Sequence, residues 1–359
     1  MTVIGIAGST ALLVTGFGLK DSIKSIVDTQ YGKLTKYEIA VNLQSNIDTQ
    51  NQDAISNFLK NDTDVKDFIF VKSESGKASA NDTTKDVSII VTDEGKNFDN
   101  FEHLQNRKTQ DTIYLPTDGI AISEKLAKLL DVKVGDKIEI IDNNDNKAEA
   151  NVSAIVEHYI NHFIYIDSNY YKSIFGITAK DNSILVKLSS EDIVSEISND
   201  LIDMDGVSGI VSNSGLKANF DDTIKSLDLV VFVMICCAGA LSFIVLYNLT
   251  NVNISERIRE IATIKVLGFY DKEVSAYIFR ENILLTAIGA LAGLLLGVVF
   301  HRFIMVTVEM DYVMFGRQIK LMSFIMAGAI TMIFSLIVNW AMYYKLKNVK
   351  MVESLKSVD

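Results

Sequence analysis

The sequence predicts an α-helical membrane protein with four transmembrane helices and a large extracytoplasmic α/β (α+β) domain inserted between the first and second helices. Two observations predict this class. Hydrophobic residues make up 48% of the 359 residues, yet 22% of the residues are charged. Apolar and charged residues must therefore be segregated along the chain. Four long runs of the sequence carry no charge, and most of the charged residues lie between the first and second of these runs.

Each uncharged run is about as long as a membrane helix. A spanning helix needs roughly 20 predominantly apolar residues, and a charge at its centre costs about 2.5–3.5 kcal/mol on insertion scales. The first run has no basic residue before it and no convincing cleavage site, so we interpret it as a membrane helix cut short at its N-terminus and not as a signal peptide. The sequence predicts transmembrane helices over 1–19, 229–252, 282–300 and 321–344.

The lysines and arginines of the connecting segments predict the orientation. The segment 253–281 carries five and the tail 345–359 carries four, whereas the loop 301–320 carries three. The positive-inside rule therefore places 253–281 and the tail in the cytoplasm, and 301–320 together with 20–228 outside. The segment 20–228 has a formal charge of −14 and no cysteine, which favours the envelope of a bacterial cell. The net charge of −11 disfavours nucleic acid as a partner.

The outer segment alternates between strand and helix patterns, which is typical of a compact α/β domain. A polar turn at 142–146 separates two extended stretches and predicts a β-hairpin. The predicted strands are 37–43, 87–91, 132–140, 150–156, 182–188 and 207–211, and the predicted helices are 53–60, 122–130 with Ser123 as N-cap, and 191–204.

The residues indicate no enzymatic site, so we assign no catalytic, cofactor-binding or metal-binding residue. His158 and His162 share one face of a predicted strand over 159–166, but no third or fourth ligand has recognisable spacing, and surface or rim histidines are the preferred interpretation over zinc ligands. The Gly-Lys pairs at 32–33 and 76–77 lack the flanking residues of a phosphate-binding loop. If ATP drives this protein, another chain binds it.

The cytoplasmic segment 251–268 is predicted to form an amphipathic helix that ends at Gly268. Its apolar stripe consists of Ile254, Ile258 and Ile261, and its charged face consists of Glu256, Arg257, Arg259 and Glu260. One interpretation is an interfacial helix whose stripe faces lipid and whose charges pair at i, i+3, as Glu256 with Arg259 and Arg257 with Glu260. The other is that the charged face docks onto a cytoplasmic motor.

The runs 246–269, 280–282 and 351–357 resemble the FtsX-like permeases of ABC transporters. The resemblance covers essentially the whole chain. The chain looks most similar to the C-terminal half of the long two-module permeases of Gram-positive bacteria. It implies a MacB-like outer domain and four helices that transmit motion across the membrane. It also implies a separate cytoplasmic ATPase of the MacB or FtsE type, so that ATP acts through the partner and no cofactor is bound directly.

The resemblance also implies the coupling residues and the further partners. A second permease module or protomer and the membrane lipid are expected neighbours. The implied function is export, lipid or lipoprotein handling, or antimicrobial peptide resistance. The alternative is a transmembrane signalling or scaffold protein that activates a cell-wall hydrolase or a sensor kinase. The implied ATPase-coupling residues are Glu256, Arg257, Arg259, Glu260, Lys265 and Gly268.

The third predicted span carries Gly289, Gly293 and Gly297 at four-residue intervals, which predicts a groove where a second helix approaches closely. Asn339 near the inner end of the fourth span is expected to form a hydrogen bond with another helix, worth about 0.6–2 kcal/mol. No Asp, Glu, Lys or Arg lies within a predicted span. This argues against a secondary transporter, which normally needs charged groups near the midplane.

Overall fold

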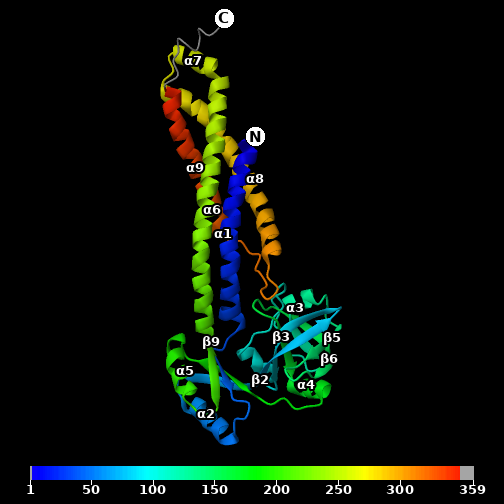
Figure 1. Cartoon of the computed structure of the whole chain (residues 1–359). Helices are drawn as coiled ribbons and strands as arrows, with labels where there is room; N and C mark the ends of the chain where they lie inside the picture. Colours follow the sequence, from blue (N-terminus) through cyan, green and yellow to red (C-terminus); the bar gives the residue numbers. More distant parts are fainter. Residues whose placement is uncertain (1, 348–359) are drawn as a thin grey trace. The chain divides into compact units, whose positions relative to one another are not determined.

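The computed structural model of the protein describes residues 2–347, apart from the side chain of Thr2 and some side chains in the last four helices. The chain forms two compact units (Figure 1). The helical unit contains the described residues of 1–23, 224–308 and 316–359, and the α/β unit contains 24–223 and 309–315. The α/β unit is therefore built mainly from the segment between the first and second long helices, as predicted.

The four long helices of the chain confirm the predicted class. They are α1 (Thr2–Thr29), α6 (Asn213–Glu256), α8 (Asp271–Val308) and α9 (Leu321–Lys347), and the short helix α7 (Ile258–Val266) joins α6 to α8. Each long helix contains a stretch that is long and apolar enough to cross a membrane. Each helix is also longer than the uncharged run that predicted it. The first continues ten residues past position 19, through Lys20 and Asp21 to Thr29.

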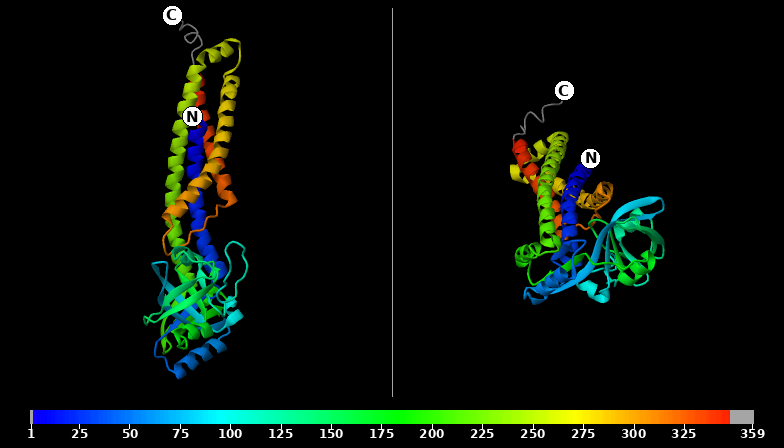
Figure 2. Two further views of the ribbon diagram at one scale, coloured as in Figure 1. Left: turned by 90° about the vertical axis from the view of Figure 1, so that its right-hand side faces the viewer. Right: turned by 60° about the horizontal axis from the view of Figure 1, so that its bottom comes forward.

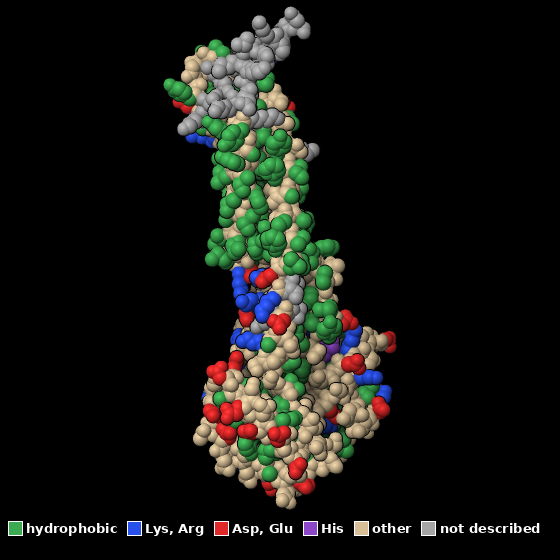
Figure 3. Space-filling model, turned by 60° about the vertical axis from the view of Figure 1, so that its left-hand side comes forward, with side chains coloured by type: hydrophobic (Ala, Val, Ile, Leu, Met, Phe, Trp, Pro, Cys, Tyr) green, Lys and Arg blue, Asp and Glu red, His purple; other side chains and the backbone are tan. Residues whose placement is uncertain are grey.

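The surface of the helical unit is apolar along the middle of these helices. Figure 3 shows a band of hydrophobic side chains on the face it presents. Leucines of α8 such as Leu291 and Leu295 are 64% and 74% exposed, and Ile325 of α9 is 57% exposed. Such a large apolar surface is unfavourable in water and favourable in lipid, which is the environment that these helices require.

The first half of the α/β unit is a four-stranded antiparallel sheet in the order β9-β1-β8-β2. Two helices cover one face, because residues of α2 and α5 such as Ile55, Leu59 and Ile197 share a core with β1 and β8. The chain order β1-α2-β2 and β8-α5-β9 is a split βαβ arrangement. The elements are β1 (Ile39–Leu43), α2 (Thr49–Asn61), β2 (Val65–Ala80), β8 (Ser183–Leu188), α5 (Val194–Ile202) and β9 (Val207–Ser212).

The second half is a closed six-stranded barrel inserted between β2 and β8. The long strand β2 (light blue in Figure 2) begins in the sheet beside β8 and ends in the barrel, where it pairs with both β3 and β5. Closure leaves the barrel without a free edge. Its other strands are β3 (Thr83–Thr92), β7 (Phe163–Asp167), β4 (Ile120–Ser123), β6 (Lys147–Val156) and β5 (Lys137–Ile141).

Alternation along the barrel strands separates two cores. Ile120 and Ile122 of β4 point into the barrel, where they pack with residues of α3 (Glu124–Leu129) and α4 (Ser168–Phe175), whereas Ala121 packs in a second core on the other side. That second core lies under the 3-10 helix η2 (Gly95–Asn100) and contains Phe98 and Tyr165. The remaining short elements are the π-helix η1 (Gln30–Leu34), which continues α1, and the 3-10 helix η3 (Glu191–Ile193) before α5.

Two local predictions for this unit were wrong. The predicted helix over 122–130 begins only at Glu124, because residues 120–123 pair with β6 and β7 as a buried strand. Ser123 does precede the helix, but its hydroxyl accepts a hydrogen bond from the backbone N–H of Phe163 at 3.3 Å and caps nothing. His158 and His162 are both buried, and not at the surface; His158 packs against Phe163 and is hydrogen-bonded to Gln30.

Candidate functional site

The apolar stripe predicted around α7 faces the protein. Ile254 and Ile261 are 3% and 2% exposed and share a core with Leu246, Val274 and Met342, which lie on α6, α8 and α9. The interpretation in which this stripe lies on lipid is therefore wrong. Burial of the stripe fixes α7 against the helical unit, so the face that carries the charges points outward.

The predicted pairing of Arg257 with Glu260 is wrong. Arg257 forms an ion pair with Glu281 of α8 at 2.9 Å, and not with Glu260, because the helix is interrupted at Arg257 between α6 and α7. Glu256, Arg259 and Glu260 are exposed, and the side chain of Lys265 lies outside the described residues. The Arg257–Glu281 pair brings α8 against the junction of α6 and α7, a contact that no spacing in the sequence predicts.

A second exposed feature adjoins these charges. Gly268 has φ +93°, a conformation that favours glycine, and it ends the helix just after Val266. The side chains on either side of it are apolar and open to solvent, with Leu267 72% and Tyr270 77% exposed. This apolar turn was not predicted from the sequence. Its signal was the run Val266-Leu267-Gly268-Phe269-Tyr270, which continues apolar beyond the point where the helix must stop.

The three glycines of α8 lie directly against α1. A Cβ atom added to Gly293 would meet Thr10 Cβ at 2.6 Å and the carbonyl oxygen of Ala7 at 2.7 Å. Similar additions at Gly289 and Gly297 would meet Ile6 and Val14 of α1 at 2.9 and 2.6 Å. The absence of side chains at these positions lets the two backbones approach closely.

Pairs of buried polar side chains form hydrogen bonds between the long helices. Asn282 of α8 donates its amide to the Oδ1 of Asn339 on α9 at 3.4 Å, which confirms the predicted interhelical hydrogen bond of Asn339. Three further pairs of buried hydroxyls are Thr286 with Ser335 at 2.9 Å, Thr10 with Thr331 at 3.0 Å, and Ser242 with Ser9 at 2.6 Å. Such bonds fix the register of helices in lipid.

The loop between α8 and α9 belongs to the α/β unit. The N–H of Met314 donates to the carbonyl of Tyr159 at 2.8 Å, and the N–H of Asn161 donates to the carbonyl of Tyr312 at 2.7 Å, so Ile160 and Val313 form an antiparallel bridge. Val313 and Met314 are buried against Tyr159 and its neighbours. The sequence predicted a loop outside the membrane here but not its pairing with the α/β unit.

Two ion pairs strengthen this attachment. Lys125 of α3 lies 3.4 Å from Glu309, and the two side chains are only 9% and 13% exposed. Lys85 of β3 lies 2.7 Å from the more exposed Asp311. The Lys125–Glu309 pair is shielded from solvent, whereas the shorter Lys85–Asp311 contact lies at the surface and is screened by water.

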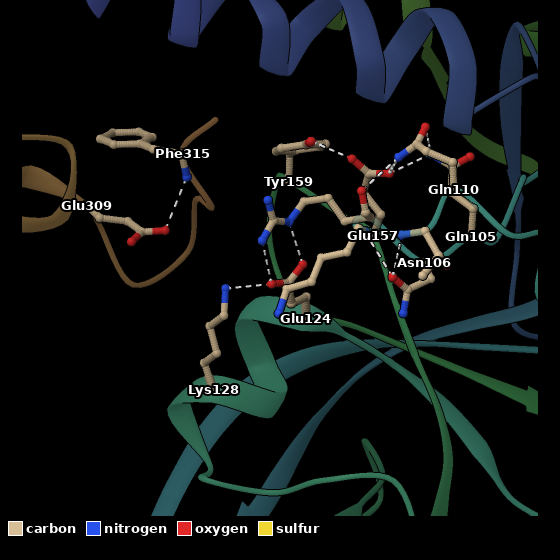
Figure 4. Close-up of polar contacts among 12 residues, drawn as sticks. Gln105, Asn106, Gln110, Glu124, Lys128, Glu157, Tyr159, Glu309 and Phe315 are labelled. Carbon is tan, nitrogen blue, oxygen red and sulfur yellow. Dashed lines mark hydrogen bonds and ion pairs between the residues drawn. The ribbon is translucent and has the colours of Figure 1, made fainter. Parts of the chain in front are cut away.

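A polar network continues from this attachment into the α/β unit. The hydroxyl of Tyr159 donates to the buried carboxyl of Glu157 at 2.5 Å, and the amide of Gln105 donates to the same carboxyl at 2.5 Å (Figure 4). Beside it, Arg107 donates two hydrogen bonds to Glu124, at 2.7 and 2.9 Å. Burial alone would raise the pKa of Glu124, but the bonds and charges of Arg107 and Lys128 lower it to about 2.

The network is structural in its chemistry. Its carboxyls are occupied by hydrogen bonds and ion pairs, and in the described part of the chain no group of three or more His, Cys, Asp or Glu side chains is arranged to hold a metal ion. What the geometry defines instead is a helical unit with exposed charged and apolar side chains around one turn, and an α/β unit that contains residues 24–223 and the loop residues 309–315.

These features define a multi-pass membrane protein with a large inserted α/β unit, and comparison with known families identifies its kind. The model of the MacB-like periplasmic core domain matches residues 1–204, and the model of the FtsX-like permease C-terminal region matches residues 232–351. The chain belongs to the MacB/FtsX family of ABC transporter permeases. Its α/β unit is the MacB-like core domain and lies outside the cytoplasm.

Among curated proteins, the chain is similar to the uncharacterized ABC transporter permease YknZ of Bacillus subtilis (strain 168). The identity is 23% over 318 residues, which is 82% of this chain and 79% of that protein.

Two solved structures are also similar. The periplasmic region of MacB from Actinobacillus actinomycetemcomitans is 14% identical, with a TM-score of 0.32, covering 52% of this chain and 93% of that chain. The extracellular domain of the noncanonic ABC-type transporter YknZ from Gram-positive bacteria is 15% identical, with a TM-score of 0.33, covering 49% of this chain and 99% of that chain.

Proposed function

We propose that this permease couples ATP hydrolysis by a separate cytoplasmic ABC ATPase to movement of its extracytoplasmic α/β unit. The observation that carries the proposal is the burial of Ile254 and Ile261. Because that stripe is used inside the helical unit, the exposed charges of Glu256, Arg259 and Glu260 need another explanation than a helix lying on lipid. A partner protein that covers them is the explanation that also fits the permease family.

The composition of this face suits a protein partner. Interfaces combine an apolar centre with a charged rim, and aromatic residues are enriched at their centre. Phe269 and Tyr270 supply exposed aromatic rings immediately beyond the charges. We assign the docking face to the charged residues and the turn together, with Arg257 holding the face in place through Glu281. The proposed docking residues are Glu256, Arg259, Glu260, Lys265, Gly268, Phe269 and Tyr270.

The connections between the two units support transmission of movement. The chain enters the α/β unit from α1 and leaves it into α6, and residues 309–315 between α8 and α9 pair with that unit. Each of the four long helices is therefore connected to the α/β unit at one end. A displacement of the helices by an ATPase would reach the α/β unit through four attachments, without a charged substrate path through the membrane.

The test is co-purification with the cognate ATPase, combined with ATPase rate in lipid. At an interface, like-charge juxtaposition costs several kcal/mol, whereas exposed charges contribute roughly 0–1 kcal/mol to stability. The double variant Arg259→Glu/Glu260→Arg is therefore expected to fold and insert normally but to lose association and stimulation. The matched control is Lys137→Glu/Glu149→Lys, which reverses an exposed pair on the β5–β6 hairpin.

The control variant should retain wild-type association. If the Arg259/Glu260 reversal also retains association and stimulation at equal expression, α7 does not engage an ATPase. If association is lost but activation of an external hydrolase or kinase persists, the chain acts as a scaffold and the coupling proposal is wrong.

A further inference from the structure

The α/β unit contains a cavity of about 140 Å³ that the coupling proposal does not use. It lies beside the core under η2, and its wall combines aromatic rings with one carboxyl group, that of Glu102. The aromatic residues that line it are Tyr31, Tyr37, Phe98, Phe163 and Tyr165.

Glu102 is buried, being 5% exposed, and no cation among the described residues pairs with it. In that part of the chain, its Oε1 accepts hydrogen bonds from the hydroxyls of Thr35 and Tyr165, each at 3.4 Å. These distances are long, because hydroxyl bonds to a carboxylate are usually about 2.5–2.7 Å. The nearby ammonium of Lys36 is engaged with Asp99 at 3.3 Å. Among the described residues, the carboxyl of Glu102 therefore has no ion-pair partner that carries a charge.

The histidine in the cavity wall is neutral. The Oε1 of Gln30 accepts a hydrogen bond from the backbone N–H of Tyr159. The Nε2 of Gln30 is therefore the atom that donates to His158 Nε2, at 3.1 Å. His158 Nε2 must accept this bond and cannot carry a proton. Burial also favours the neutral imidazole, because it lowers the pKa of His158 to about 3. The imidazole, 3.9 Å from Glu102, supplies no positive charge.

Burial in the cavity wall favours the protonated form of Glu102. Burial raises the pKa of this carboxyl to about 8, although the bonds from Thr35 and Tyr165 act in the opposite direction. Burial also raises the pKa of Tyr31 to about 12 and moves the pKa values of Tyr37 and Tyr165 upward, so these phenols stay neutral. Glu102 is thus the group in this cavity that changes charge between about pH 6 and 9.

We propose that this cavity binds the ammonium group of an alkylammonium ligand, ion-paired with Glu102 and surrounded by the aromatic side chains. A buried carboxylate with aromatic neighbours is the chemistry that recognises organic cations. A cavity of about 150 Å³ accommodates a ligand of benzene size, roughly six heavy atoms. A free primary amine of that size or the side chain of a lysine would fit equally.

The cavity is also lined by residues of η1, which follows α1, and by the first residues of α6. Gln30 and Tyr31 belong to η1, which continues α1, while Asn213 and Leu216 begin α6. Asn213 is held by hydrogen bonds to the backbone of Tyr37 and Glu38. A bound ligand would contact the starts of both connections out of the α/β unit. The binding proposal itself does not depend on any ATPase.

The test measures binding of n-butylammonium to the full chain in detergent by ligand-observed NMR and calorimetry, with empty micelles as background. A ligand of five heavy atoms is expected to bind with a dissociation constant on the order of 1 mM. n-Butanol, which has the same shape without the charge, should bind at least about tenfold more weakly. Equal binding of the two, or no saturable binding at about 10 mM, would overturn the proposal.

Two variants and the pH dependence provide independent checks. Glu102→Gln should reduce affinity roughly 100-fold or more, since it removes one member of a buried ion pair, whereas Glu196→Gln on the exposed face of α5 should change nothing. Tyr31→Leu should weaken binding by roughly 2- to 30-fold through loss of its ring. Wild-type affinity should fall about tenfold per pH unit below about 8, with one proton released per cation bound.

A second probe, Nα-acetyl-lysine amide, distinguishes the two sources of the ammonium group, which are a free amine and the side chain of a lysine. Binding of this probe with the same Glu102 dependence indicates a peptide lysine as the ligand, and binding of n-butylammonium alone indicates a free amine. If butylammonium binds with pH-independent affinity or equally well to Glu102→Gln, the cation is not paired with Glu102 and the proposal fails.

Discussion

The carbonyl oxygen of Tyr159 accepts a hydrogen bond from the N–H of Met314 at 2.8 Å, although 155 positions separate the two residues in the chain. Tyr159 also donates its hydroxyl to Glu157 inside the α/β unit. One residue therefore joins the loop between α8 and α9 to the buried polar network of the α/β unit. This attachment adds a third chain segment to the two connections made by α1 and α6.

Met314→Ala is expected to lower the stability of the α/β unit by about 2–4 kcal/mol, because truncation of a fully buried methionine loses apolar contacts and leaves a cavity. Met310→Ala, four residues away and 42% exposed, should cost less than about 0.5 kcal/mol. Urea unfolding of both variants, followed by a probe in the α/β unit, checks the difference. Equal effects of the two would show that the loop does not pack as described.

Gly293→Leu should weaken the contact between α1 and α8, because any added side chain meets the backbone of Ala7. The matched control is Gly328→Leu on α9, where an added Cβ has open space. The melting temperature in detergent should fall for the first variant and stay close to wild type for the second. Membrane insertion should be normal in both. A wild-type melting temperature for Gly293→Leu would mean that α1 and α8 do not touch there.

The raised pKa of Glu102 makes a prediction about stability and pH. The pKa of Glu102 in the folded protein, about 8, lies above the ordinary value of 4.5. Between pH 4.5 and pH 8, the carboxyl is therefore protonated in the folded state and ionised in the unfolded state. Stability contributed by this group is fully present below about pH 4.5 and is lost as pH rises towards 8, by at most about 1.4 kcal/mol per pH unit. Glu102→Gln should therefore gain stability relative to wild type as pH rises from 5 to 8. A constant difference between the two proteins over this range would contradict the assignment.

The orientation of α7 is checked by cysteine labelling on intact cells, in a background where Cys236 and Cys237 are replaced by alanine. A cysteine at the exposed Asn144 in the β5–β6 turn should react with a membrane-impermeant reagent. A cysteine at the exposed Glu273, at the start of α8, should react only after the cells are permeabilised. The reverse pattern would place the proposed docking face outside the cell.

The membrane helices and the strands could be predicted because their signals are local. Uncharged runs and period-2 alternation depend only on neighbouring residues, and they located α6, α8, α9 and most strands of the α/β unit. Residues 122–123 were misassigned to a helix because their helical pattern was overridden by pairing of the strand 120–123 with β6 and β7. Short apolar stretches take their structure from tertiary partners that the pattern does not name.

The candidate site was predictable only in part for a similar reason. The charged face of 256–260 follows from spacing on one predicted helix, but the pairing of Arg257 with Glu281 depends on how separate helices meet. The attachment of Met314 to Tyr159 and the burial of Glu102 beside His158 join segments more than fifty residues apart. No spacing rule in a single sequence connects such residues, so their identification required the fold.

The coupling proposal is tested most directly by measuring the distance between a spin label at Asn144 in the α/β unit and one at Gln318 in the helical unit. The measurement uses the complex with the cognate ATPase in lipid, without nucleotide and with ATP trapped by a hydrolysis-deficient ATPase. We expect the distance distribution to shift on ATP binding in wild type and to remain unshifted in Arg259→Glu/Glu260→Arg. An unchanged distribution in the wild-type complex, or an equal shift in the reversed variant, would contradict coupling through α7.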